Sequence, residues 1–232
     1  MKKIGLIGGL SWHSTIDYYR IINEEISKKY GGLHSAEIVL WSFDFQAIAD
    51  LQAQAAWEDA TRKMVEAGLA LKAAGADMLA ICTNTMHKMA PDVEDICGLP
   101  LLHIVDATAE EIRRQNLKKV ALLATRFTME HDFYRGRLAE KHGITAIVPD
   151  SKGREAVHKV IFDDLCQGSV CPHARQHFID IIDDLAAQGA EGVILGCTEI
   201  GLLVKQDDVP IPVFDTTPIH ARAIAAAAME QE

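Results

Sequence analysis

The sequence lacks the features that mark nucleic-acid-binding and membrane proteins. Its 23 lysines and arginines are outnumbered by 33 aspartates and glutamates, which gives a formal net charge of −10. A surface of this sign disfavours contact with nucleic acids and anionic membranes, because both attract positive patches. The sequence has no run of about 18 uninterrupted apolar residues, the length that a membrane-spanning helix needs. We therefore expect neither a nucleic-acid partner nor a membrane partner.

The sequence also lacks a signal peptide and a framework of paired cysteines. The apolar run near the N-terminus is too short for a signal peptide. Five cysteines occur, an odd number without a CxxC motif, at positions 82, 97, 166, 171 and 197. This pattern is typical of reduced thiols, and it does not predict zinc binding. We expect a cytoplasmic protein without a metal site.

What the sequence does contain is a cysteine at the end of an apolar run. Residues 192–195 (GVIL) are typical of a buried parallel strand, and Gly196 and Cys197 follow at an expected helix start. Catalytic groups in open α/β sheets lie at such strand ends. Helix N-terminal amides are expected to lower the pKa of this thiol from its reference value of about 8.5. Cys197 is therefore a candidate catalytic base, and the alternative is a small buried apolar residue.

The strand pattern of the first half occurs again in the second half. Each strand again leads into a turn rich in small polar residues, and three correspondences follow in the same order. Such a repeat indicates two copies of one α/β unit. The matched segments are 2–9 with 118–125, Thr83 with Cys197, and 99–106 with 209–215.

The repeat predicts an α/β fold of two pseudo-symmetric three-layer α/β domains with mostly parallel sheets. We place the first domain at residues 1–99 plus 208–232 and the second at residues 100–207. The final helix, 216–229, is expected to return and pack on the first domain. Paired units of this kind bind ligands where their strand ends face each other, which predicts an interdomain active-site cleft. The threonine and the cysteine that correspond in the repeat would then lie opposite each other.

Hydrophobic periodicity predicts the elements of the first half. A helix should run from Ser11 to beyond Ile26, followed by a strand at 36–43. A long alanine-rich segment, 46–74, carries helical periodicity and ends before a glycine suited to a helix C-cap. A third strand is expected at 78–82.

A threonine stands where the repeat requires a partner for the cysteine. The pKa of its hydroxyl is close to that of bulk water, far above neutral pH, so Thr83 cannot act as a free base. Three interpretations stay open: a helix N-cap, a hydrogen bond to substrate, and relay of a proton through a water molecule. The adjacent Cys82 points to the other face of the sheet by strand alternation and is interpreted as structural.

Small polar residues follow the other strand ends. Residues 8–11, Asn84, Thr85, 125–128 and Thr198 supply backbone amides and hydroxyls at helix starts. Such groups hold carboxylates without a fixed positive charge. Asn84 and Thr85 are also good N-caps for the segment that follows. We expect these turns to bind an anionic small molecule.

Several titratable residues lie close to these turns in the sequence. His87, His103 and His220 are interpreted as structural histidines. Glu199 and Asp106 either polarise groups near the thiol or serve as solvated or capping residues.

Four motifs occur in order along the chain: GGLSWHST at 8–15, CTNTMH at 82–87, TMEHDFY at 128–134 and GCTE at 196–199. Together they resemble the cofactor-independent aspartate/glutamate racemase family, most closely the bacterial branch that acts on L-aspartate and L-glutamate. The resemblance covers essentially the whole chain. It implies two pseudo-symmetric α/β domains with a cleft between them, no pyridoxal phosphate or other cofactor, and often a homodimer.

In most of that family, each half of the chain supplies one cysteine. This sequence keeps the second as Cys197 and has Thr83 at the position of the first. The resemblance implies that Cys197 deprotonates the L-enantiomer, and Thr83 is the second candidate catalytic residue. The substrate contacts that we expect are Leu10, Gln52, Asn84, Thr85, Thr125, Thr128 and Thr198.

We therefore expect an amino-acid racemase that acts on L-aspartate, L-glutamate or both. The expected partners are a small amino-dicarboxylate substrate and a second copy of the chain. One alternative is an enzyme that resembles arylmalonate decarboxylases, which also keep only the second cysteine. The low aromatic content, 6%, favours a small polar substrate over an aromatic one. The other alternative is a non-catalytic amino-acid-binding homologue.

Overall fold

The chain forms two compact units, each of which is described here by itself. The computed structural model describes residues 1–169 and 172–230. The first unit consists of Met1–His103 with His220–Glu232, and the second consists of Ile104–Ile219. Among the described helices, none combines the length and the apolar character needed to cross a membrane.

The first unit is built on a four-stranded sheet in which every pair of neighbouring strands is parallel. Its strand order is β2-β1-β3-β4. β1 and β3 lie in the middle and are fully buried, as expected for strands covered on both faces. The strands are β1 (Ile4–Gly8), β2 (Ile38–Ser42), β3 (Met78–Ile81) and β4 (Leu101–Leu102).

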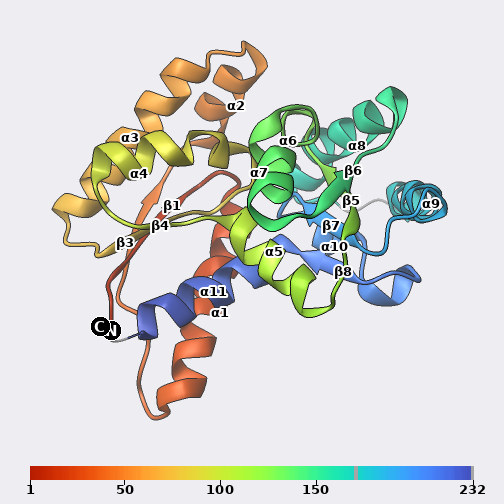
Figure 1. Cartoon of the computed structure of the whole chain (residues 1–232). Coiled ribbons are helices and arrows are strands. Elements are labelled where there is room, and N and C mark those ends of the chain that lie inside the picture. Colours follow the sequence, from red (N-terminus) through yellow and green to blue (C-terminus); the bar gives the residue numbers. More distant parts are fainter. Residues whose placement is uncertain (170–171, 231–232) are drawn as a thin grey trace. The chain divides into compact units, whose positions relative to one another are not determined.

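Helices cover both faces of this sheet, so the first unit has three layers (Figure 1). One face packs against α1 (Trp12–Tyr30) and the later part of α11 (Thr216–Met229). The other face packs against α2 (Phe45–Ala53), α3 (Trp57–Ala73) and α4 (Ala90–Cys97). A short 3₁₀ helix, η1 (Thr85–Met89), follows β3.

The return of the last helix to the first unit is confirmed. Its apolar residues Ala221, Ile224 and Ala228 lie in the same buried cluster as Ile4 and Tyr18. Burying an aliphatic side chain of valine or isoleucine size stabilises a fold by about 1.5–3 kcal/mol. The alanine-rich composition of α11 lets it approach the sheet closely.

The prediction of one continuous helix at 46–74 is wrong. The segment forms two helices, α2 and α3, because the chain turns at residues 54–56. Ala55 there has φ of +54°, a left-handed conformation that no continuous helix contains. Gly75 follows α3 with φ of +90°, the conformation that favours glycine at a helix end.

The second unit repeats the sheet of the first. Its strand order is β6-β5-β7-β8, again with parallel neighbours, so each strand corresponds to one in the first unit. This confirms the repeat that the sequence predicts. The strands are β5 (Lys119–Ala124), β6 (Thr145–Ile147), β7 (Val193–Gly196) and β8 (Val213–Asp215).

The strands that end each sheet determine where the units divide. β4 pairs with β3 in the first sheet, and β8 pairs with β7 in the second. The grouping therefore changes at Ile104 and at His220. The sequence placed the changes earlier, at residues 100 and 208.

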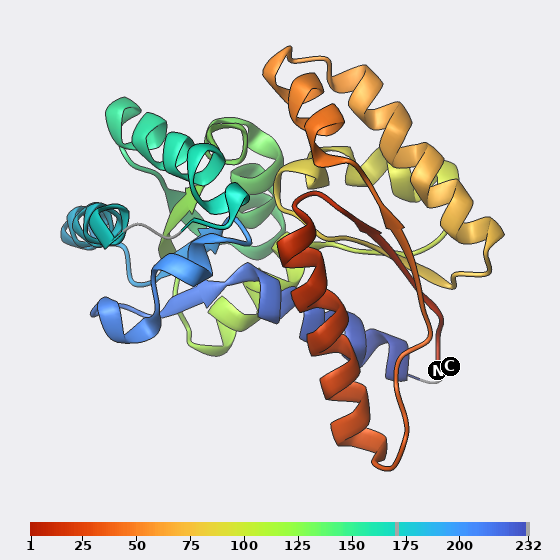
Figure 2. The ribbon, with the colours of Figure 1, turned by 180° about the vertical axis from the view of Figure 1, so that it is seen from behind.

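Helices also lie on both faces of the second sheet (Figure 2). Its core is continuous and includes Val120, Leu122, Leu138, Phe178 and Leu195, all buried. The helices of this unit are α5 (Ile104–Arg114), α6 (Arg126–Glu130), α7 (Asp132–His142), α8 (Ser151–Asp163), η2 (Leu165–Gln167), α9 (Pro172–Ala187), α10 (Ile200–Leu203) and η3 (Gln206–Asp208).

The cysteines are free thiols wherever the structure describes them. These are Cys82, Cys97, Cys166 and Cys197, which agrees with the expectation of reduced thiols. Cys171 lies outside the described residues.

Candidate active site

The turn after β1 brings a strained serine to the start of α1. Gly9 has φ of +71°, and a Cβ there would lie 2.3 Å from the backbone nitrogen of Phe43, so only glycine fits. Ser11 has φ of +47°, a conformation that costs a non-glycine residue of order 1–3 kcal/mol. Its buried hydroxyl has no hydrogen-bond partner among the described residues. Buried polar groups are normally paired, so this hydroxyl is a candidate to bind a ligand.

Leu10, between these two residues, has its side chain in the core. It is buried in the cluster that also contains Ile7, Ile48 and Met86. Only the backbone of Leu10 is therefore a candidate for substrate contact.

The turn after β3 carries the threonine that the repeat singles out. Thr83 is half-buried, and its backbone carbonyl accepts a hydrogen bond of 2.7 Å from Nδ1 of His87. Asn84, not Thr83, occupies the N-cap position of η1, and it makes no side-chain capping bond there. The N-cap interpretation of Thr83 is therefore wrong. The preceding Cys82 is fully buried in the core beneath α1 and α11, which supports its structural interpretation.

A buried cluster of three histidines, His87, His103 and His220, packs against this turn. The ring of His87 lies at an inclined angle to the rings of His103 and His220, with centroids 4.6 Å and 5.5 Å away. Nε2 of His220 donates to the Leu102 carbonyl at 2.9 Å, so Nδ1 accepts the hydroxyl proton of Tyr18 at 2.9 Å. Burial lowers the pKa of His220 to about 4. These contacts agree with structural roles for the three histidines.

Two further candidate residues of the first unit lie beside the same turn. Gln52, on α2, is buried, and its Nε2 donates to Sδ of Met86 at 3.1 Å. Thr85, at the start of η1, is also buried. The first unit therefore gathers its predicted polar residues at the carboxyl ends of β1 and β3.

The turn after β5 holds two threonines in contact with each other. Thr125 is the N-cap of α6, and its Oγ1 accepts from the amide of Thr128 at 3.4 Å. The two hydroxyl oxygens lie 3.2 Å apart, and both side chains are buried. This pair places two hydroxyls at one strand end of the second unit.

In the turn after β7, the carboxylate of Glu199 lies beside the candidate base, Cys197. Cys197 is 7% exposed, and its thiol donates to Oε2 of Glu199 at 3.1 Å. The Thr198 hydroxyl donates to the same oxygen at 2.7 Å. Glu199 is 2% exposed, and its other oxygen, Oε1, is buried without a hydrogen-bond partner among residues 1–169 and 172–230. A buried carboxylate with one unpaired oxygen points to a group that arrives with a ligand.

The expected lowering of the thiol pKa is wrong. Burial raises the pKa of Cys197 well above its ordinary value, and the negative charge of Glu199 and the nearby Cys166 raise it further. The backbone amide of Glu199 acts in the expected direction but is outweighed. The helix that follows, α10, has only four residues, and its first amide already bonds to the Cys197 carbonyl. The thiol is therefore protonated in the unliganded protein.

The carboxylate of Asp106 is paired with other side chains, so it is not available to polarise the thiol. Its carboxylate accepts from Arg137 at 2.7 and 2.5 Å and from His142 at 2.8 Å. Partial burial raises the pKa of Asp106, but these hydrogen bonds outweigh that effect and hold it below its usual value. Asp106 ties α5 to α7.

The sequence contains one pair of histidines with the spacing of metal ligands, His173 and His177, on α9. In the part of the chain that the structure describes, no group of three or more histidine, cysteine, aspartate or glutamate residues is placed to hold a metal ion.

The predicted site residues therefore fall into two sets, each at the carboxyl edge of its own sheet. Leu10, Gln52, Asn84 and Thr85 lie with Thr83 in the first unit. The second set consists of Thr125, Thr128, Cys197 and Thr198. That Thr83 faces Cys197 stays a prediction from the sequence.

Comparison with known proteins identifies one family. A family model described as Asp/Glu/hydantoin racemase matches residues 7–224. A curated relative is the broad specificity amino-acid racemase RacX of Bacillus subtilis. It is 22% identical over 223 residues, which cover 95% of each chain.

Solved structures share the fold over nearly the whole chain. A Yersinia pestis protein, provisionally assigned as an Asp/Glu racemase, is 53% identical with a TM-score of 0.92, and the match covers 99% of this chain and 100% of that one. An aspartate racemase homologue from Pyrococcus horikoshii, PH1733, is 37% identical with a TM-score of 0.83, and the match covers 99% of this chain and 100% of that one.

Proposed function

Because this chain belongs to the Asp/Glu/hydantoin racemase family and is by that membership an isomerase, we propose that its substrates are L-aspartate, L-glutamate or both. In this proposal Cys197 removes the α-proton of the L-enantiomer, and the opposite face of the carbon is reprotonated from the side of Thr83. No pyridoxal phosphate takes part. The residues that contact the substrate in this proposal come from both sets of polar residues at the sheet edges.

The observation that carries the proposal is the hydrogen bond from the Cys197 thiol to Glu199. A protonated thiol is a poor base, so it must first lose its proton. We propose that Oε2 of Glu199 takes it: the S–H bond breaks, an O–H bond forms, and the negative charge moves from oxygen to sulfur. No additional net charge is buried, because the carboxylate is neutralised as the thiolate forms. The substrate ammonium group, once bound nearby, stabilises the thiolate further.

The thiolate then abstracts the α-proton and becomes a thiol again. The electron pair of the broken C–H bond moves into the substrate carboxylate, which develops enediolate character. Hydroxyls and amides at the two sheet edges stabilise this charge. The unpaired hydroxyl of Ser11, beside the first amides of α1, supports a role in holding a substrate carboxylate.

Reprotonation from the other face differs from abstraction. A threonine hydroxyl forms an alkoxide too reluctantly to act as a second base, so Thr83 orients a water molecule whose O–H bond breaks as the new α-C–H bond forms. The hydroxide that remains takes up the proton held by Glu199, which restores water, the Glu199 carboxylate and the Cys197 thiol. The hydrogen bond from His87 to the Thr83 carbonyl fixes the backbone that carries this hydroxyl. The abstracted proton exchanges with solvent through the hydrogen bond between the Cys197 thiol and Glu199, and return of a solvent-derived proton from Cys197 then competes with delivery by water. We therefore expect more exchange of the α-hydrogen of the L-substrate than inversion.

The proposal is tested by incubating the protein with a panel of L- and D-amino acids in heavy water and following the α-proton by NMR. L-aspartate or L-glutamate should lose its α-proton signal, and the D-enantiomer should accumulate more slowly. Binding without exchange would identify a non-catalytic amino-acid-binding homologue. Release of carbon dioxide from an arylmalonate, without exchange of amino acids, would identify a decarboxylase.

Two further expectations from the sequence belong to this proposal. We propose a cytoplasmic location, which free thiols at Cys82, Cys97, Cys166 and Cys197 support. We also propose that the chain forms a homodimer.

A further inference from the structure

Two polar atoms at the carboxyl edge of the second sheet are buried without a hydrogen-bond partner. One is Oε1 of Glu199, in the turn after β7, and the other is Oγ1 of Thr217, in the first turn of the helix that follows β8. The two residues are 2% and 3% exposed, and neither atom has a partner among the residues that the structure describes. Buried polar atoms are normally paired, so these two point to a group that arrives with a ligand.

The pairing of β7 with β8 brings these two turns next to each other. The strands are parallel, and their last pair in register is Leu195 with Asp215. Two residues beyond that pair, Cys197 follows one strand and Thr217 follows the other. Oγ1 of Thr216 donates to the Leu195 carbonyl at 2.9 Å, which holds the start of α11 against β7. The first turn of α11 therefore adjoins the turn that carries the candidate base.

The internal repeat contains an equivalent threonine whose hydroxyl is paired. Thr217 follows Asp215 by two residues, as Thr108 follows Asp106, and the two aspartates correspond in the repeat. The Thr108 hydroxyl donates to the Ile104 carbonyl at 2.8 Å, one helical turn earlier. Thr217 is only the second residue of its helix, so no helical turn precedes it. Its hydroxyl is therefore available to a partner from outside the described chain.

Two carboxylates lie at this corner of the second unit. Oε2 of Glu199 accepts from neutral groups, the Cys197 thiol and a neighbouring hydroxyl, so Glu199 has no cationic partner among the described residues. Oδ1 of Asp215 accepts from the amide of Thr217 at 3.1 Å, and a side chain on Gly201 would clash with the same carboxylate. Asp215 thus occupies the helix end that would otherwise attract an anion. A ligand cation fits this corner better than a ligand anion.

We propose that Oε1 of Glu199 and Oγ1 of Thr217 bind the ammonium group of a free α-amino acid. Both atoms accept hydrogen bonds, and an ammonium group supplies several donors together with the positive charge that the buried carboxylate lacks. Cys197 and Glu199 together carry one negative charge before and after the thiol proton moves, so the ammonium group stays paired throughout. This inference rests on the proposed function and names the part of the substrate that this corner selects.

The same corner separates substrate classes within the family, which includes hydantoin racemases as well as aspartate and glutamate racemases. The corresponding nitrogen of a hydantoin is a neutral amide with a single N–H group. It can donate to only one of the two acceptors, and it leaves the buried carboxylate without a cation. We therefore expect free amino acids, and not hydantoins, as substrates.

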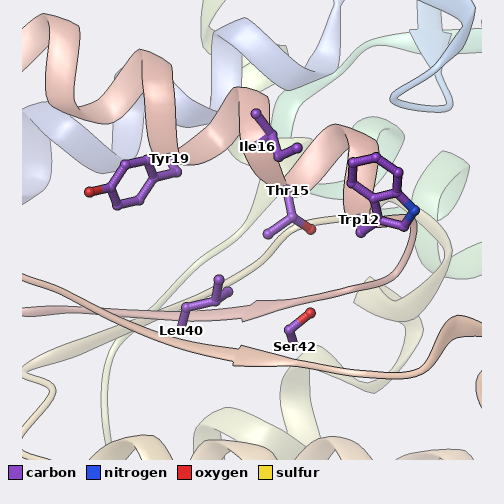
Figure 3. Close-up of a pocket in the computed structure, with 6 residues that line it drawn as sticks. All are labelled: Trp12, Thr15, Ile16, Tyr19, Leu40 and Ser42. Carbon is purple, nitrogen blue, oxygen red and sulfur yellow. The ribbon is translucent and has the colours of Figure 1, made fainter.

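A pocket on the first unit does not offer the same chemistry. It lies between α1 and β2 and has a volume of about 250 Å³ (Figure 3). Its lining residues are Trp12, Thr15, Ile16, Tyr19, Leu40 and Ser42. None of them is charged, so an ammonium group would find no carboxylate partner there. Binding in that pocket would also not depend on Thr217, which belongs to the second unit.

The test compares two ligands in calorimetric titrations of the full chain: L-aspartate, and succinate, which keeps both carboxylates but has no ammonium group. Thr217→Val replaces the hydroxyl with a methyl group and should weaken L-aspartate binding about 10-fold, because a hydrogen bond to a charged group is lost. Succinate should bind the wild type and this variant equally. Thr217→Ser keeps the hydroxyl and should restore L-aspartate binding. L-glutamate is compared with glutarate in the same way.

Thr145→Val is the matched control, because Thr145 is an exposed threonine of the same unit, and it should bind both ligands like the wild type. Circular dichroism verifies that the variants are folded. If Thr217→Val weakened L-aspartate and succinate equally, or weakened neither, the ammonium site would be overturned even where the wild type exchanges the α-proton. Equally tight binding of L-aspartate and of its hydantoin would overturn it as well.

The ammonium site and the proposed reaction can fail separately. Selective weakening of L-aspartate by Thr217→Val, in a protein that shows no α-proton exchange, would support the site and overturn the reaction. A wild type that binds neither L-aspartate nor L-glutamate would overturn both.

Discussion

The strand ends after β3 and after β7 occupy equivalent places in the two units, but they carry different chemistry. After β3, the half-buried Thr83 is held through its carbonyl by a histidine from a buried cluster of three histidines. After β7, the buried Cys197 donates its thiol proton to the carboxylate of Glu199. The scaffold is repeated while the reactive groups are not. The asymmetry of the proposed reaction therefore lies in a few side chains and not in the fold.

The largest effect should follow removal of the only thiol at these two positions. Cys197→Ser should lower both α-proton exchange and inversion at least ~10⁴-fold, because an alkoxide forms far less readily than a thiolate. NMR in heavy water measures exchange, and chiral chromatography measures inversion. Cys97→Ser is the control, since the Cys97 thiol donates to the Val65 carbonyl and a serine hydroxyl can do the same. Full activity in Cys197→Ser would remove the thiol from the mechanism.

The second largest effect should follow a change of Glu199, the carboxylate that is present after β7 and has no counterpart after β3. Glu199→Gln should lower kcat about 10²–10³-fold with a smaller change in KM, because the thiol loses its proton acceptor. The same change should speed alkylation of Cys197 by iodoacetamide, because removal of the negative charge lowers the pKa of the thiol.

These opposite directions separate a proton acceptor from a purely structural residue. Glu191→Gln, on an exposed residue of the same unit, should change neither rate. If Glu199→Gln slowed alkylation and catalysis together, the proposed role of the carboxylate would be contradicted.

The buried histidines of the first unit give a stability test. The pKa of His220 is about 4 in the folded protein and about 6.5 when unfolded, so the unfolded chain binds the proton first as pH falls. The stability from keeping His220 neutral is complete above about pH 6.5, and about 3 kcal/mol of it is lost by pH 4. His220→Gln keeps a donor for Leu102 and an acceptor for Tyr18 but does not titrate. Urea unfolding at several pH values should show a shallower loss for this variant, and equal slopes would contradict the assignment.

The smallest effect should come from restoring a thiol at the β3 end. Thr83→Cys should raise inversion about 10-fold while changing exchange little, since Cys197 already carries out exchange. Thr83→Ser keeps the hydroxyl and should behave like the wild type. An unchanged ratio of inversion to exchange in Thr83→Cys would show that the residue does not face the reacting carbon.

The sequence predicted the elements whose signals are local and repeated. The strands β1, β3 and β4 and their counterparts β5, β7 and β8 follow from segments that occur twice, and the bounds of the last helix, 216–229, agree with α11. The strand β2 was predicted from its own apolar run at 36–43, and the three-residue strand β6 was not predicted. The break between α2 and α3 was missed because helical periodicity continues across residues 54–56. An alanine gives no local signal for the left-handed conformation that Ala55 adopts.

The electrostatics of the site were less predictable than its position. The sequence identified a thiol at a strand end, but the sign of its pKa shift depends on burial and on the direction of the Glu199 side chain. Neither follows from residue order. Ser11 was recognised as a turn residue, yet its importance lies in a buried hydroxyl that makes no capping bond to α1. A serine before a helix usually makes that bond, so the sequence does not indicate that the Ser11 hydroxyl is unpaired.

The central claim, that one end of the repeat holds an efficient base and the other does not, is tested most directly by the first turnovers of the wild type in heavy water. Starting from L-aspartate or L-glutamate, the initial rate of deuterium incorporation into the L-enantiomer and the initial rate of formation of the D-enantiomer are measured together. Exchange should exceed inversion, because the thiol proton exchanges with heavy water through Glu199 and Cys197 then returns a deuteron more readily than a water held by Thr83 delivers one. Equal rates from the first turnover would contradict the account.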